Sequence, residues 1–194
     1  MTGGTMRAAV YRGKGDLEVA EIAVPPVGPS EVRVAVEYCG VCGTDLHDVL
    51  DGWGVSGSIG GHEWSGRVVE VGSSARLEMG TLVVGHPGSA CGRCAACQAG
   101  RPNLCEGRST AGVEQSHGAF ADYVVVDSDQ ALTVPPGVEA RAAAYAEPLA
   151  VALHALELAG VDPGHRVMVS GCGPIGAATV AALIAQGHDD VVVV

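Results

Sequence analysis

The sequence has 194 residues, 47% of them hydrophobic and 17% charged, a composition that permits a packed core and argues against extensive disorder. Its formal net charge of −11 at pH 7, without a cluster of Lys and Arg, excludes nucleic acid as the expected partner. The sequence lacks both an apolar run of about 18 residues and a secretory signal, so we expect a cytoplasmic protein without a membrane segment.

Short β segments, rich in Val and flanked by Gly, Pro or Asp, fill the chain as far as Pro136. They are residues 7–12, 17–24, 31–38, 67–71, 81–84 and 123–126. Turn signals at this regular spacing predict a β domain of the barrel or sandwich type. Residues 139–160 are instead rich in Ala and Leu and end at Gly160, which predicts a helix with a glycine cap.

The C-terminal part of the sequence alternates between strand and helix. Residues 165–170 are typical of a buried strand, residues 177–186 of a helix, and residues 191–194 of a second strand. This order forms a βαβ unit, the start of a parallel α/β sheet. Because one such unit cannot bury both faces of a parallel sheet, we expect the chain to be a fragment of a longer protein.

Four of the seven cysteines lie close together, at Cys91, Cys94, Cys97 and Cys105. An odd total without an export signal argues against a disulfide framework. Closely spaced thiolates without a histidine favour a closed tetrahedral zinc site, which would be structural because no position stays open for substrate. An iron–sulfur cluster is the competing interpretation, since four cysteines also bind such clusters. We expect zinc.

A second set of possible ligands is Cys42, His62 and Glu63. Each residue alone is weak evidence, because a single Cys is usually a small buried hydrophobe. Together they offer one thiolate, one imidazole and one carboxylate. A catalytic zinc needs three protein ligands and one open position, and it acts there as a Lewis acid.

A glycine-rich turn of the form G-x-G-x-x-G lies between the first predicted strand of the βαβ unit and its helix. In this context it predicts a pyrophosphate site at the helix N-terminus, whereas a plain βα turn is the alternative. The candidate cofactor-binding residues are Gly171, Gly173, Pro174, Ile175 and Gly176. The acidic residue that contacts the cofactor ribose is expected about 20 residues further on, beyond Val194, so NAD and NADP are not distinguished.

These motifs occur in the order found in the medium-chain zinc alcohol dehydrogenases, and the sequence resembles that family from Met6 to Val194. The motifs are the Cys42-Gly-Thr-Asp-x-His47 run, the Gly61-His62-Glu63 box, the four cysteines and the glycine turn. The resemblance implies a GroES-like β-barrel catalytic domain over residues 1–146. It also implies that residues 147–194 are a linking helix and the first βαβ unit of an incomplete Rossmann domain, giving an α+β and α/β fold class.

The resemblance further implies roles for individual residues. Cys42 and His62 would bind the catalytic zinc, and Glu63 would be a ligand or exchange with water. Glu147 stands where the primary-alcohol enzymes carry a cysteine ligand, and Glu followed by Pro148 resembles the sorbitol, butanediol and threonine dehydrogenase branch. Glu147 would therefore contact the metal directly or through water, unless it is only a carboxylate at a helix N-terminus. Secondary alcohols or polyols are the expected substrates.

By the same resemblance, Thr44 would take the alcohol proton, His47 would pass it towards solvent, and Asp45 would orient the metal ligands. The implied protein is a zinc-dependent oxidoreductase, dimeric or tetrameric, that transfers a hydride between the alcohol and NAD or NADP, with one catalytic and one structural zinc per chain. Two alternatives stay open: a truncated, non-catalytic zinc-binding fragment, and a zinc-free quinone reductase of the same superfamily, which would lack this ligand set.

Overall fold

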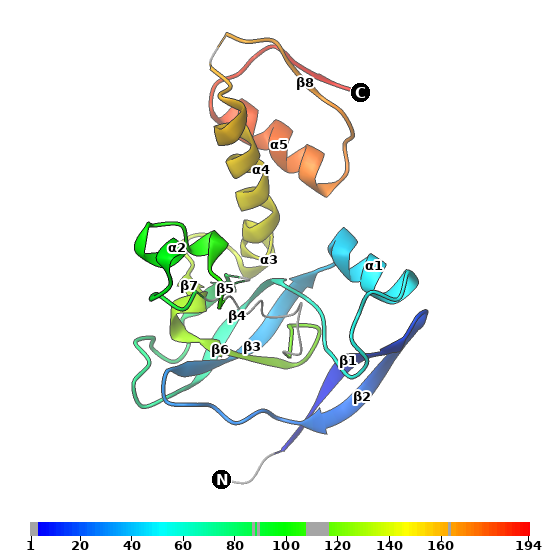
Figure 1. Cartoon of the computed structure of the whole chain (residues 1–194), viewed down its shortest axis with the longest axis vertical. Helices are drawn as coiled ribbons and strands as arrows, with labels where there is room; N and C mark the ends of the chain where they lie inside the picture. The colour runs from blue at the N-terminus through cyan, green and yellow to red at the C-terminus, as the bar shows by residue number, and fades with distance from the viewer. Residues whose placement is uncertain (1–3, 87, 89, 108–116, 163) are drawn as a thin grey trace. The chain divides into compact units, whose positions relative to one another are not determined.

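A computed structural model describes residues 4–86, 88, 90–107, 117–162 and 164–194. The chain divides into two compact units, Met1–Ala144 and Tyr145–Val194 (Figure 1). The first unit contains the candidate metal ligands apart from Glu147, and the second contains Glu147 and the glycine turn.

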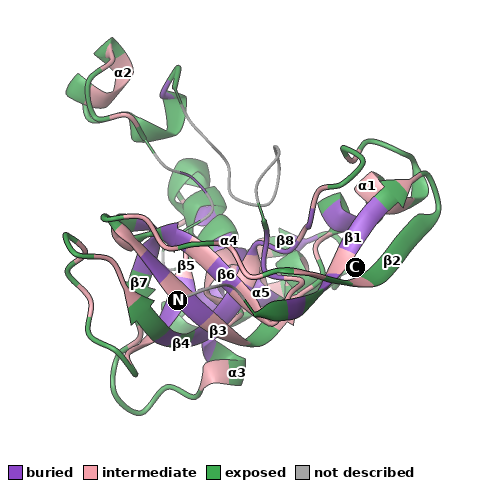
Figure 2. Cartoon of the chain, turned by 90° about the horizontal axis from the view of Figure 1, so that it is seen from below, coloured by how far each residue is buried: buried purple, intermediate pink, exposed green. Residues whose placement is uncertain are grey.

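A five-stranded antiparallel sheet forms the centre of the first unit, in the part of the chain where the spacing of the β segments predicts a β domain. Its strands, in spatial order, are β6 (Tyr123–Asp127), β3 (Glu31–Gly40), β4 (Glu63–Val71), β5 (Leu82–Gly85) and β7 (Ala131–Thr133). Val-rich strands bury one face, and Val32, Val34 and Val124 are almost fully inaccessible. Figure 2 shows buried residues along the strands of this sheet.

A hairpin of β1 (Thr5–Gly13) and β2 (Asp16–Ala23) completes the β part of the first unit. Isolated bridges join β1 to residues outside the hairpin, pairing Ala8 with Ala121 and Val10 with Ile59. Ala8, Val10 and Ile59 form a second small core where the hairpin meets the rest of the unit. The hairpin and the sheet together enclose a barrel-like arrangement.

Helices of the first unit are short: α1 (Gly43–Leu50), α2 (Ala95–Gln98) and α3 (Ala140–Ala143). The first unit also contains two 3₁₀ turns, Pro102–Leu104 and Ser128–Gln130. The expectation of one helix over residues 139–160 was wrong, because the helix is interrupted at Ala144 and Tyr145. Pro148 has no N–H to donate to the carbonyl of Ala144, so the α-helical pattern cannot continue through this point.

The second unit contains α4 (Ala146–Ala159), β8 (Val167–Val169), α5 (Pro174–Ala185) and β9 (Val191–Val193). Gly160 ends α4 in the left-handed conformation, and β8 and β9 pair in parallel, which confirms the predicted βαβ unit. Helix α5 begins at Pro174, three residues before the expected Ala177, since proline suits the first turn of a helix. None of the helices in the described part of the chain has the length and apolar character to cross a bilayer.

Candidate metal centres and cofactor turn

Two groups of side chains in the described part of the chain lie close enough together to hold a metal ion. The first group consists of Cys91, Cys94, Cys97 and Cys105, which we call the four-cysteine lobe. Their sulfur atoms lie within 4.8 Å of one another. Cys94 is the N-cap of α2, Cys97 lies within α2, and Cys105 follows the first 3₁₀ turn.

The geometry of the four-cysteine lobe fits a single zinc ion. A tetrahedron with zinc–sulfur bonds of about 2.3 Å has edges of about 3.8 Å. The Sγ atom of Cys94 lies 3.5 Å from that of Cys97 and 3.9 Å from that of Cys105. An iron–sulfur cluster would spread these sulfurs further apart, because they would be shared among two or four irons instead of binding one ion.

Backbone N–H groups in the four-cysteine lobe donate hydrogen bonds to sulfur atoms, which stabilises the thiolate form. The N–H of Cys91 donates to Cys105 Sγ at 3.2 Å, and the N–H of Cys94 donates to Cys91 Sγ at 3.4 Å. Backbone hydrogen bonds, led by that from Cys97, lower the pKa of Cys94 to about 6. Burial, by contrast, raises the pKa of Cys97 to about 12. A bound cation would favour deprotonation of all four thiols.

The second group consists of Cys42, His62 and Glu63, which we call the Cys-His-Glu cluster. Their ligating atoms also lie within 4.8 Å of one another. Strand β3 pairs with β4 so that Gly40 lies opposite Glu63, and this register brings the segment after β3 against the start of β4. The structure therefore brings together three candidate ligands that the sequence separates widely.

Asp45 connects the two halves of the Cys-His-Glu cluster. One of its carboxylate oxygens accepts the N–H of Cys42 at 2.8 Å, and the other accepts the N–H of Gly61 at 3.3 Å. The second oxygen also lies 3.8 Å from Nδ1 of His62. Only 6% of Asp45 is exposed, so these hydrogen bonds are shielded from solvent and hold the ligand segments in place.

His62 fits the role of a metal ligand. It is 9% exposed, and its Nδ1 has no hydrogen-bond partner among the described residues. A buried ring nitrogen without a partner is costly. An imidazole that binds a metal through its other nitrogen usually donates Nδ1–H to a carboxylate or carbonyl, and Asp45 is the carboxylate nearby.

Gly61 sets the backbone path that leads into His62. Its φ of 94° lies in the left-handed region, which is costly for residues with a side chain. A Cβ atom here would also lie 2.8 Å from the Phe120 ring and 2.9 Å from Cys39 Sγ. Glycine is therefore required by both conformation and space.

The two residues expected to move the proton lie on α1. Thr44 Oγ1 is 3.7 Å from Cys42 Sγ, so its hydroxyl borders the cluster. Nδ1 of His47 lies 2.6 Å from a carboxylate oxygen of Asp51, and its ring stacks on Trp53 with centroids 4.7 Å apart. Sequence reasoning missed Asp51 and Trp53; the four-residue spacing from His47 to Asp51 would have been informative had α1 been predicted.

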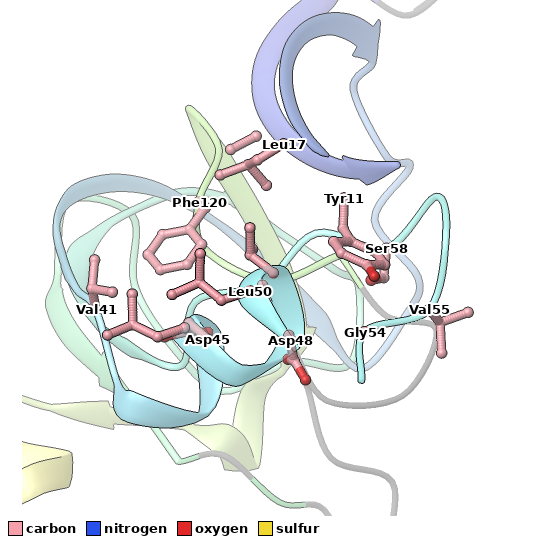
Figure 3. A pocket seen from close by; sticks show the side chains of 14 residues that line it. Tyr11, Leu17, Val41, Asp45, Asp48, Leu50, Gly54, Val55, Ser58 and Phe120 are labelled. Carbon is pink, nitrogen blue, oxygen red and sulfur yellow. The ribbon is translucent and has the colours of Figure 1, made fainter. Parts of the chain in front are cut away.

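A pocket of about 340 Å³ lies between α1, the β1–β2 hairpin and residues 54–60 (Figure 3). Its lining is mainly apolar and includes Tyr11, Leu17 and Phe120. Asp45 belongs both to this lining and to the hydrogen bonds around the cluster. Burial, followed by the nearby charge of Asp45, raises the pKa of Asp48, another lining residue.

The glycine turn in the second unit has the geometry of a phosphate-binding turn. Gly171 has a φ of 90°, which permits the sharp turn, and Gly173 is the N-cap of α5. A Cβ on Gly176 would lie 2.0 Å from the carbonyl oxygen of Gly171, so glycine is needed for helix and turn to pack. Pro174 and Ile175 begin α5, and because the first N–H groups of a helix have no partner within it, those after Pro174 can face an anion.

Glu147 lies in the first turn of α4, where a carboxylate interacts favourably with the helix dipole. It belongs to the second unit, whereas the Cys-His-Glu cluster belongs to the first. A contact between Glu147 and the metal stays a prediction.

Comparison with known proteins identifies the family to which the chain belongs. A profile of the alcohol dehydrogenase GroES-like domain matches residues 28–136, a range that includes both candidate metal groups of the first unit. Sorbitol dehydrogenase from Halalkalibacterium halodurans is 37% identical over 194 residues, which cover 97% of this chain and 56% of that protein. The chain thus spans little more than half the length of this curated relative.

Two solved structures give the same result. A zinc-binding dehydrogenase from Sinorhizobium meliloti 1021 bound to NADP matches with a TM-score of 0.91 and 37% identity, over 98% of this chain and 56% of that chain. The 2R,3R-butanediol dehydrogenase from Bacillus subtilis matches with a TM-score of 0.87 and 33% identity, over 97% of this chain and 57% of that chain. The chain therefore belongs to the zinc-containing medium-chain alcohol dehydrogenase family, through its GroES-like domain.

Proposed function

We propose that this chain supplies the metal-binding and alcohol-binding part of a zinc-dependent oxidoreductase that transfers a hydride between a secondary alcohol or polyol and NAD or NADP. The observation that carries the proposal is the convergence of Cys42, His62 and Glu63, whose segments are joined by Asp45, a residue that also lines a largely apolar pocket. Three ligands of mixed type leave room for a fourth, as a catalytic zinc requires. The relatives named sorbitol and butanediol dehydrogenase support the substrate class.

Within this proposal, Cys42 and His62 hold the catalytic zinc, and Glu63 is a ligand or exchanges with water. Glu147 contacts the metal directly or through water. When bound, zinc supplies a Lewis acid that lowers the pKa of a hydroxyl group. Asp45 fixes the approach of both ligand segments through its hydrogen bonds to the N–H groups of Cys42 and Gly61.

The proton leaves by the residues of α1. Thr44 lies next to the cluster and accepts the proton of the alcohol, and His47 passes it to solvent. His47 suits this role because its side chain is about half exposed, at 54%. One end of the route is therefore at the metal cluster and the other is in contact with water.

The remaining parts of the proposal concern stability, cofactor and assembly. The four-cysteine lobe holds a second, structural zinc, so each chain carries two. Gly171, Gly173 and Gly176, with Pro174 and Ile175, receive the pyrophosphate of the nicotinamide cofactor. We also propose a cytoplasmic protein that forms a dimer or tetramer and binds neither nucleic acid nor membranes.

Activity measurements on the zinc-loaded chain test the proposal. Sorbitol and 2,3-butanediol are supplied with NAD⁺ or NADP⁺, ethanol serves as the primary-alcohol comparison, and nicotinamide absorbance reports hydride transfer. We expect the wild-type chain to reduce NAD⁺ or NADP⁺ with sorbitol or 2,3-butanediol and to reduce little of either with ethanol. We expect H62A to reduce neither cofactor with any of these alcohols. Two bound zinc ions without any hydride transfer would instead support the alternative of a non-catalytic zinc-binding fragment.

A further inference from the structure

His47 is held on two sides by residues outside the metal cluster. Its Nδ1 lies 2.6 Å from Asp51 Oδ2, a hydrogen-bond distance between a helical residue and the residue four positions later. One face of its ring stacks on Trp53, with an angle of 19° between the two ring planes. The backbone N–H of Asp51 also donates to the carbonyl of His47 at 3.0 Å, so the helix end and the ring are fixed together.

The direction of the hydrogen bond determines where the imidazole carries its proton. An ionised carboxylate only accepts hydrogen bonds, so Nδ1 of His47 must be the donor. In neutral imidazole one nitrogen carries the hydrogen and the other carries a free lone pair. With hydrogen on Nδ1, the lone pair lies on Nε2, and Nε2 becomes the atom that can accept a proton.

We propose that Asp51 is a positioning residue for proton transfer, which holds His47 in the Nδ1–H tautomer and so makes Nε2 the proton acceptor. This inference rests on the proposed function only for its use in the reaction, because the tautomer itself follows from the geometry. Thr44 takes the proton of the alcohol and passes on its own hydroxyl proton, which adds to Nε2; the imidazolium then carries both N–H bonds, and loss of the Nε2 proton to water restores the Nδ1–H form. No electrons are exchanged in this step.

Trp53 supports the same state of the ring. Stacking limits rotation of the imidazole about its Cβ–Cγ bond, which would otherwise carry Nδ1 away from Asp51.

A second histidine in the chain provides the comparison. His154 and Glu157 also face each other on one helix, but Nδ1 and the carboxylate oxygen are 3.7 Å apart, and both side chains are largely exposed. This distance exceeds that of a hydrogen bond. The His47–Asp51 contact is therefore closer than the other helical histidine–carboxylate pair, although that pair is three residues apart instead of four.

Nitrogen-15 NMR of the zinc-loaded 194-residue chain tests the proposal directly. Long-range correlations between ring protons and ring nitrogens identify the tautomer at a pH where the imidazoles are neutral, and H47Q identifies the His47 signals. We expect the Nδ1–H form of His47 to predominate. In D51N the amide NH₂ can donate to Nδ1, so the balance should reverse to Nε2–H, whereas E157Q should leave the tautomers of His154 and His47 unchanged.

The proposal is overturned if wild-type His47 is mainly Nε2–H, or if a folded D51N variant leaves its tautomer unchanged. The wild-type spectrum decides the first point without relying on the folding of any variant. Failure of the proposed function would look different. The wild-type chain would then show no hydride transfer with any alcohol, although His47 could still be in the Nδ1–H form.

Discussion

The four-cysteine lobe and the Cys-His-Glu cluster both gather metal ligands, but the chain builds them differently. Every ligand of the lobe comes from one short segment between Cys91 and Cys105, with α2 and a 3₁₀ turn placing the thiols. The ligands of the cluster come from either side of the β3–β4 pairing, and Asp45 connects them by hydrogen bonds. The first site needs a local loop, whereas the second needs the sheet.

Because of this difference, we expect a metal in the lobe to stabilise the fold and a metal in the cluster to take part in the reaction. Four thiols close the coordination sphere of the lobe, so a metal there can only hold the loop together. Three mixed ligands leave one position of a tetrahedral metal open, so a metal in the cluster could bind a small molecule. The comparison predicts that each site can be damaged without the other.

The largest effect is expected from C94S, which removes one of four thiolates from the lobe. The lobe should lose its zinc, because structural zinc contributes on the order of 10 kcal/mol to the folding of small metal-binding segments. Limited proteolysis should then cut between Cys91 and Cys105 much faster than in the wild type. A protease-resistant segment in metal-free C94S would show that the loop folds without zinc.

H62A should have the opposite pattern. Loss of one of three protein ligands should weaken metal binding at the cluster by more than the roughly 10–100-fold that an outer-shell partner contributes. The lobe should keep its zinc and its resistance to protease. H154A, at an exposed histidine of α4, is the matched control and should retain both metals. Equal zinc loss in H62A and H154A would rule out the cluster as the site.

G61A should damage the cluster through the backbone. The left-handed conformation costs a residue with a side chain about 1–2 kcal/mol, and overpacking against Phe120 and Cys39 adds about 1–3 kcal/mol. We expect about 2–5 kcal/mol less stability in urea unfolding, with weaker metal binding at His62. G43A is the control, because no atom lies within 4 Å of a Cβ there. Similar losses in both variants would contradict the packing explanation.

D45N is expected to have the smallest effect of the four. Asparagine can accept one of the two backbone hydrogen bonds but lacks the charge that would hold a metal-bound His62. Metal affinity at the cluster should fall about 10–100-fold, as it does when an outer-shell carboxylate is lost. Competition with a colorimetric chelator measures this affinity. Unchanged affinity at the cluster, or a matching fall at the lobe, would exclude a positioning role for Asp45.

The same contrast determines what could be predicted from sequence. The lobe was visible in the spacing of Cys91, Cys94, Cys97 and Cys105, because ligands of one ion lie within one loop. The cluster could not be assembled from spacing, since it depends on the register that sets Gly40 opposite Glu63. For that site, a family resemblance had to stand in for the missing geometry.

Most strands were predicted from Val-rich runs between turn residues, but β7 and α1 were missed. Strand β7 has three residues, too few to show a period, and α1 begins with Gly43, which is more typical of a turn. Without α1, the contact of His47 with Asp51 was invisible in the sequence. The interruption at Ala144 was also missed, although Pro148 signals that the backbone N–H is absent.

The zinc content of purified protein tests most directly whether the chain carries two separate metal sites. Elemental analysis of the wild type, C94S and H62A, each dialysed against the same buffer, gives the number of ions per chain. We expect two in the wild type and one in each variant, with the remaining ion at the undamaged site. One or no zinc in the wild type, or loss of both ions by a single substitution, would contradict two independent sites.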